Sequence, residues 1–183
     1  MARSAKTLAR PEHVPAHHVR YWSTMKLGVI VLWGLVLSSG ILVGASLLER
    51  ATITPLWAGS PPESVVGWPY GAIQKPFFIV ATPPWALLSL AVLVVSFLAL
   101  PDAARPWARV AGAIGIGVMI WTLVFFVPIL DRTEGNRGAG LSGDEIARLA
   151  NRFVTWGYVR TAILAAGWIA AIRALILASG GAP

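Results

Sequence analysis

Four stretches of this sequence carry almost no charge, and their length constrains the fold more than any other feature. Three of them contain no charged residue, at positions 27–48, 77–100 and 110–130. A helix of about 20 apolar residues is long enough to cross the hydrocarbon core of a bilayer. A fourth stretch, at 153–177, has a similar length but contains two arginines. Because hydrocarbon offers no partners for backbone polar groups, each stretch is expected to be helical. We predict an all-α integral membrane protein, a bundle of four transmembrane helices.

The composition favours one membrane domain over a water-soluble one. Of the 183 residues, 56% are hydrophobic and 13% are charged, which is too little polar surface for a soluble domain of this size. We assign residues 27–178 to a single membrane domain, between a basic tail at 1–26 and a short C-terminal tail at 179–183. Cysteine is absent, which excludes disulfides, thiolate metal sites and thiol catalysis.

The basic residues, which give a net charge of +7, indicate topology. They lie at the ends of apolar stretches and form no stripe with interleaved aromatic residues, so we predict a lipid-bilayer environment and no nucleic-acid partner. The N-terminal tail and the second connection contain Arg3, Lys6, Arg10, Arg20, Lys26, Arg105 and Arg109. By the positive-inside rule, both termini are expected in the cytoplasm, with the protein in a bacterial inner membrane. A smaller group favours the opposite orientation: Arg132, Arg137, Arg148 and Arg152.

Proline, aromatic and capping residues mark the expected helix ends and connections. Residues 49–76 contain Pro55, Pro61, Pro62, Pro69, Trp57, Trp68 and Tyr70. Prolines oppose a long helix and aromatic rings suit the headgroup region, so we expect an extramembrane loop that lies along the membrane as a lid. Pro83 and Pro84 are expected in the first turn of the regular part of the second helix. Ser142 and Glu145 have the spacing of a capping box, which predicts a helix start there.

Arg160 is the most informative residue of the fourth stretch. Only 12 residues, 161–172, separate it from Arg173, too few to span a bilayer, so Arg160 is expected inside the membrane stretch. An arginine at the centre of a transmembrane helix costs about 2.5–3.5 kcal/mol on the insertion scale. It therefore needs an acid or a wet cavity. In a four-helix bundle, one end gathers Glu49, Arg50, Asp131, Arg132, Asn151 and Arg160, and the acids available to Arg160 are Glu49 and Asp131.

Aromatic residues accompany this polar end. Phe153 and Trp156 precede Arg160 by seven and four residues and share its helix face. One stripe of the third helix carries Trp121, Phe125 and Pro128. An aromatic pocket with an arginine at its rim would bind a flat, partly anionic molecule such as a phenolate or a quinone. The same residues allow a structural alternative, in which the ion pair clasps helix ends and the tryptophans form an interfacial belt.

Signals for metal and nucleotide chemistry are weak or missing. His13, His17 and His18 follow Glu12, but Pro15 interrupts the helical spacing between the first two histidines, so no metal site is predicted. The sequence has no phosphate-binding lysine loop, no serine elbow and no intramembrane histidine pair. Nucleotide, hydrolase and haem functions therefore lack the residues that they need.

Glycines indicate where helices approach one another closely. Gly40 and Gly44 form a G-x-x-x-G motif in the first apolar stretch, and we assign it to packing inside the bundle. The third stretch offers a thin packing face with Gly112, Gly115 and Gly117.

A further pattern covers residues 107–175. TLVFFVPILDR is followed by a short loop with a helix and then by LANRFVTWGYVRTAILAAGW. This arrangement resembles the signature of the anthrone-oxygenase-like family, four-helix membrane proteins whose bacterial members often have no assigned function. The positions that fit are Thr122, Pro128, Arg132, Asn151, Phe153, Arg160 and Thr161. Two positions depart from the signature: Asp131 stands where an amide is usual, and Gly157 stands where a histidine is expected.

The resemblance implies oxygenation of an anthrone to an anthraquinone without a tightly bound cofactor. Such chemistry needs a base to form an electron-rich phenolate or carbanion, and a dry pocket to hold it. With glycine at 157, the candidate catalytic acid–base residues are Asp131 and Glu49. The candidate substrate-binding residues are Arg160, Trp121, Phe125, Trp156 and Asn151.

Two functions from different classes stay open at this point. The first is an oxygenase or related oxidoreductase that acts on a lipophilic aromatic or quinone-like molecule, which enters laterally between helices. In that case Arg160 would hold the anionic oxygen and Asp131 or Glu49 would move the proton. The second is a non-catalytic accessory or structural subunit, whose glycine faces and aromatic loop pack against partners in a larger membrane complex. The sequence leaves open whether the protein forms a homo-oligomer or such a complex.

Overall fold

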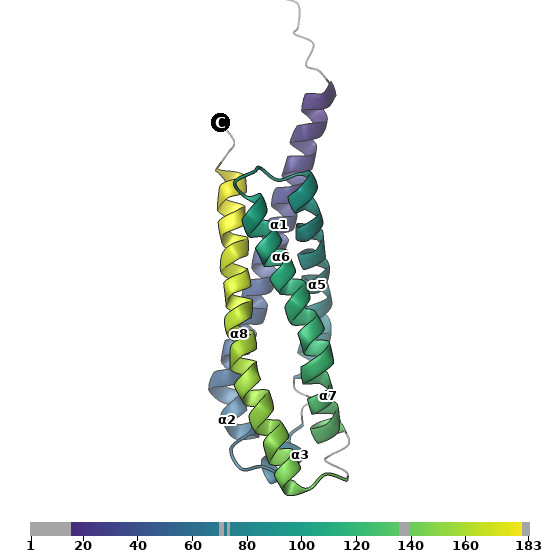
Figure 1. The fold of residues 1–183 in the computed structure, drawn as a ribbon, viewed down its shortest axis with the longest axis vertical. Coiled ribbons are helices and arrows are strands. Elements are labelled where there is room, and N and C mark those ends of the chain that lie inside the picture. The colour runs from purple at the N-terminus through teal and green to yellow at the C-terminus, as the bar shows by residue number, and fades with distance from the viewer. Residues whose placement is uncertain (1–15, 70–71, 73, 136–139, 181–183) are drawn as a thin grey trace, which may run out of the picture.

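The computed structural model describes residues 16–69, 72, 74–135 and 140–180, and four long helical rods dominate this part of the chain (Figure 1). The first rod consists of α1 (Ala16–Leu48), a π-helical segment η1 (Glu49–Ile53) and α2 (Thr54–Trp57). The second is α5 (Lys75–Leu98). The third contains α6 (Arg105–Trp121), η2 (Thr122–Phe126), α7 (Val127–Leu130) and η3 (Asp131–Gly135). The fourth is α8 (Gly143–Ser179), and the short α3 (Glu63–Val66) lies between the first two rods.

The rods form a closed bundle. α1 contacts α5 and α8, and α6 contacts the same two helices from the other side. The start of α1 and the end of α8 lie at one end of the bundle, whereas α2, α3, α7 and the start of α8 lie at the other (Figure 1). This second end, called the α2/α7 end below, therefore brings together residues from all four rods.

The outer faces of the bundle are apolar, as expected for contact with lipid. Four helices in the described residues are long and apolar enough to cross a membrane. Large apolar side chains project from them, among them Leu37, Ile41, Leu90, Val94 and Ile169. The protein is thus an integral membrane protein, and the predicted all-α bundle of four transmembrane helices is confirmed.

Small residues and two tryptophans hold the helices together. Gly112 and Gly115 of α6 lie against Ser89 of α5, which is completely buried. The indole of Trp85 donates a hydrogen bond of 3.0 Å to Ser39 Oγ of α1. The indole of Trp168 donates one of 3.0 Å to the Val36 carbonyl. Because lipid provides no hydrophobic driving force between helices, close packing and such hydrogen bonds supply the association energy.

Of the two glycines in the G-x-x-x-G motif of α1, one packs against another helix. The Trp168 indole lies against Gly40, where an added Cβ would be 3.3 Å from Nε1. No atom lies within 4 Å of a Cβ added at Gly44. Gly40 thus serves packing inside the bundle, as the sequence indicated.

Several helix ends differ from the expected positions. α1 begins at Ala16, inside the tail proposed for residues 1–26, and the first rod runs past position 48 to Trp57. Its Pro55 lies in the first turn of α2, where a missing N–H is tolerated. α5 begins at Lys75, so Pro83 and Pro84 lie inside this helix, which neighbouring helices make tolerable in a membrane bundle.

The start of α8 agrees with the sequence. The Ser142 hydroxyl accepts a hydrogen bond from the Glu145 N–H, and the Glu145 carboxylate accepts one of 3.0 Å from the Ser142 N–H. Both halves of the predicted capping box are therefore present.

Candidate functional site

A cavity of about 550 Å³ lies at the α2/α7 end. Its apolar wall comes from α5 and from the third rod and includes Phe78, Ile79, Met119, Leu123 and Phe126. Ile79 and Leu123 are more than half exposed, so the wall is open between α5 and η2. The volume is that of a typical small-molecule site.

Four charged residues also line this cavity, each from a different segment. They are Glu49 of η1, Lys75 of α5, Asp131 of η3 and Arg160 of α8. The two acids and the arginine are the charged residues that the sequence analysis selected. Lys75 and Asp131 are exposed, Arg160 is half-buried and Glu49 is buried. The cavity therefore contains an apolar wall, a buried carboxylate and a partly buried guanidinium.

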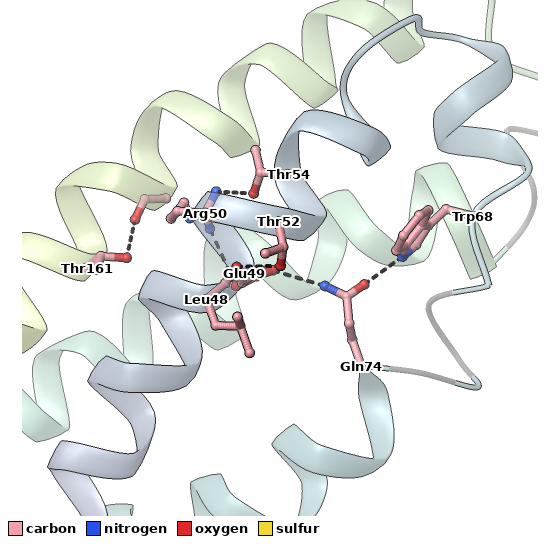
Figure 2. A network of polar contacts seen from close by, with 9 residues as sticks. Leu48, Glu49, Arg50, Thr52, Thr54, Trp68, Gln74 and Thr161 are labelled. Carbon is pink, nitrogen blue, oxygen red and sulfur yellow. Dashed lines mark hydrogen bonds and ion pairs between the residues drawn. The ribbon is translucent and has the colours of Figure 1, made fainter.

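Glu49 belongs to a chain of polar contacts (Figure 2). Its Oε1 accepts a hydrogen bond of 3.2 Å from Gln74 Nε2. Gln74 Oε1 in turn accepts one of 2.7 Å from the indole of Trp68. Both Glu49 and Gln74 are buried, and Trp68 lines the cavity. These contacts fix the direction of the Glu49 carboxylate from the side of α5.

Arg50, the next residue of η1, is the buried cation beside this carboxylate. It is 5% exposed, and its Nη2 lies 3.7 Å from Glu49 Oε2, an ion-pair distance too long for a hydrogen bond. Its Nη1 donates a hydrogen bond of 3.4 Å to Thr54 Oγ1. The guanidinium carbon also lies 5.7 Å from the ring centre of Phe153 and 5.6 Å from that of Tyr158.

The guanidinium of Arg50 rests on Gly157 of α8. A Cβ added at Gly157 would be 2.6 Å from Arg50 Nη1, far inside contact distance. Thr161 donates a hydrogen bond of 2.9 Å to the Gly157 carbonyl, on the same stretch of helix. Figure 2 shows Arg50 directed from η1 toward α8. The position where the family resemblance led us to expect a histidine thus provides room for an arginine from another rod.

Arg160 lines the cavity from α8. Its guanidinium carbon is 4.4 Å from the ring centre of Phe126, a distance at which a cation is attracted by the ring. Phe126 is fully buried and lines the cavity. Arg160 and Glu49 therefore line the same cavity. Glu49 thus lies both beside Arg50 and in the site that contains Arg160.

The other predicted binding residues lie outside the cavity lining. Trp121, Phe125 and Trp156 form an aromatic cluster, with ring centres of Trp121 and Trp156 5.8 Å apart. Trp121 also contacts the ring of Phe126, at 5.6 Å. Asn151 is exposed at the start of α8. The aromatic cluster supports the cavity wall through Phe126, and Asn151 does not contribute to that wall.

The described residues contain no group of three or more His, Asp or Glu side chains that could hold a metal ion. Glu12, His13 and Pro15 of the histidine motif lie outside the described residues.

The fold and the site define a class: a small four-helix membrane protein with a charged, largely apolar cavity at one end. The family model described as anthrone oxygenase matches residues 76–170, just over half of the 183 residues, and the chain belongs to this family. No curated protein and no solved structure matches the chain. The matched segment contains Asp131 and Arg160, whereas Glu49 and Arg50 lie before it.

Sequence reasoning missed the roles of Arg50, Gln74 and Phe126. The sequence contained a signal for the first, because Glu49 and Arg50 are adjacent at the end of an apolar stretch. Such a pair is usually solvated at a helix end, and only the continuation of the first rod to Trp57 encloses it. Gln74 and Phe126 are common residue types, and their sequence context gives no comparable signal.

Proposed function

We propose that this protein is an oxygenase that converts a lipophilic phenolic polycycle of the anthrone class to the corresponding quinone. The cavity is the observation that supports this function most strongly, because it combines an apolar wall with Glu49 and Arg160. A flat, weakly acidic molecule needs such a combination of apolar surface, base and cation. Family membership agrees with the same activity.

The reaction assigns a role to each charged group. Arg160 holds the substrate oxygen as an anion, and Glu49 accepts a proton from the ring methylene group. The resulting electron-rich carbanion transfers electrons to O₂ and forms a C–O bond. Loss of water then leaves the second carbonyl, so that one anthrone and one O₂ give one anthraquinone and one H₂O. The substrate supplies all four electrons that O₂ accepts, and the chemistry requires no tightly bound cofactor.

Asp131 and Lys75 are proposed to act at the mouth of the cavity. Both line it and both are exposed, so they can exchange protons with water. Asp131 returns the proton from Glu49 to solvent between turnovers. Phe126 stacks on the substrate, while Trp121, Phe125 and Trp156 hold that ring in place. The substrate enters from the lipid between α5 and η2, where Ile79 and Leu123 leave the wall open.

The orientation follows from the basic residues. We place the protein in a bacterial inner membrane with both termini in the cytoplasm, because residues 1–26 are rich in arginine and lysine and the start of α6 carries Arg105 and Arg109. A single cysteine introduced at Gly180 should then resist a membrane-impermeant maleimide added to intact cells. Rapid labelling from outside would reverse the assignment.

Oxygen uptake by the purified protein tests the activity. With an anthrone as substrate, the wild type should consume O₂ above the protein-free rate, one molecule per quinone formed. Glu49→Gln should lower kcat by about 100-fold or more, the usual contribution of a general base. Asp131→Asn should lower kcat less, and Arg160→Gln should mainly raise KM. Glu63→Gln is the matched control, because this exposed acid of α3 does not line the cavity.

The same experiment separates the enzyme from the accessory subunit. An enzyme purifies alone or as a homo-oligomer and turns over. A protein that shows no uptake and leaves mild detergent with stoichiometric partners would be a subunit of a membrane complex. A Glu49→Gln variant with the wild-type rate would refute the assigned base.

A further inference from the structure

The buried Arg50 is not used by the reaction scheme above, and it lines neither wall of the cavity. It is nevertheless held on three sides. Thr54 accepts a hydrogen bond from Nη1, the rings of Phe153 and Tyr158 lie near the guanidinium, and Gly157 forms the surface beneath it. Burial of a cation is costly unless a nearby group compensates the charge. The acid close to it is Glu49, at 3.7 Å.

Glycine is required at position 157 for this arrangement. Any larger residue would place its Cβ against the guanidinium, with contacts of 2.6 Å to Nη1. In a helix interior glycine is unfavourable compared with alanine by about 1 kcal/mol. The contact with Arg50 explains why the residue with the smallest side chain stands at this point of α8.

We propose that Arg50 is a positioning residue, which is seated on Gly157 and holds the Glu49 carboxylate in place at the cavity. Gln74, the residue before α5, holds one carboxylate oxygen, and Arg50 attracts the other from within η1. The two adjacent residues of η1 thus form a unit, in which the arginine fixes the position of the carboxylate. This inference rests on the proposed function only for the role of Glu49 as the base.

Other charged groups also act on Glu49 and must be considered. Lys75 of α5, Asp131 of η3 and Arg160 of α8 line the same cavity. The two cations attract the Glu49 carboxylate and Asp131 repels it. Arg50 differs from them because it is buried and within ion-pair distance, and an opposite charge has its largest effect in a poorly solvated place.

Covalent labelling of Glu49 tests the inference without any measurement of turnover. Dicyclohexylcarbodiimide is a lipid-soluble reagent that attacks protonated carboxyl groups, and mass spectrometry of the modified peptide identifies the residue. At one fixed pH, labelling of Glu49 should increase several-fold in Arg50→Gln, because the carboxyl group loses the cation that lies 3.7 Å from it. Arg50→Lys keeps the charge and should label close to the wild type. Glu49→Gln gives the background.

Gly157→Ala is the second variant, because it leaves both charged side chains in the protein. The added methyl group displaces the guanidinium, so labelling of Glu49 at the same pH should increase as well, by a smaller factor. Gly44→Ala is the matched control, since a Cβ added at this helical glycine meets no atom within 4 Å. Circular dichroism verifies that every compared variant is folded.

The outcomes separate this inference from the proposed activity. If Arg50→Gln and Gly157→Ala both label Glu49 to the same extent as the wild type, Arg50 does not act on Glu49 and the inference is wrong. If labelling increases as described while no variant or wild-type protein consumes O₂, the Arg50–Glu49 unit stands and the oxygenase assignment fails.

Discussion

Gly115 and Gly117 lie two residues apart on α6, yet only the first contacts another helix. A Cβ added at Gly115 would be 2.6 Å from Ser89 Cβ and closer still to Ser89 Oγ, whereas one added at Gly117 meets nothing within 4 Å. The composition of the third stretch indicated a glycine packing face, but it could not distinguish these two positions. The distinction depends on which side of α6 faces α5, and a short stretch that is apolar all round does not specify that side.

This difference makes a direct prediction at the scale of single residues. Gly115→Ala should lower the free energy of unfolding by about 1–3 kcal/mol relative to Gly117→Ala, because the methyl group overpacks a tight contact. Both changes raise helix propensity equally, so the difference between them isolates packing. Unfolding in mixed detergent micelles with increasing dodecyl sulfate measures it. Equal stability of the two variants would show that α5 and α6 do not approach at Ser89.

At the scale of elements, the π-helical segments of the long rods supply side chains that line the cavity. Glu49 comes from η1, Thr122 and Phe126 from η2, and Asp131 from η3, and all four line the cavity. A π segment changes the i→i+4 hydrogen-bond pattern locally and is frequent at functional sites. In the first rod it places two adjacent residues, Glu49 and Arg50, inside the protein.

The sequence predicted the long helices better than these irregular segments. Apolar length specified four crossings, and the Ser142–Glu145 spacing specified the start of α8, because both signals are local. The continuation of the first rod was missed, since Pro55 was taken to oppose a helix. In the structure, η1 and η2 each end two residues before a proline, Pro55 and Pro128.

At the scale of the whole molecule, the bundle concentrates its polar residues at one end and leaves its flanks apolar. The sequence predicted that Glu49, Asp131 and Arg160 would gather there, because chain reversal in an even-numbered bundle forces it. The sequence alone could not indicate which aromatic rings line the cavity. Phe125 and Phe126 are neighbours of the same type, and only the geometry of η2 directs Phe126 inward.

Photolabelling with 4-hydroxybenzophenone tests the central claim, that this cavity binds a flat phenolic ketone, most directly. The probe is a phenolic diaryl ketone, and its excited carbonyl inserts into adjacent C–H bonds. Mass spectrometry should locate the label on cavity residues of α5 and η2, such as Phe78, Ile79 and Leu123, and an excess of anthraquinone should suppress it. Labels that resist competition and lie on lipid-facing residues such as Leu37 and Leu90 would contradict the account.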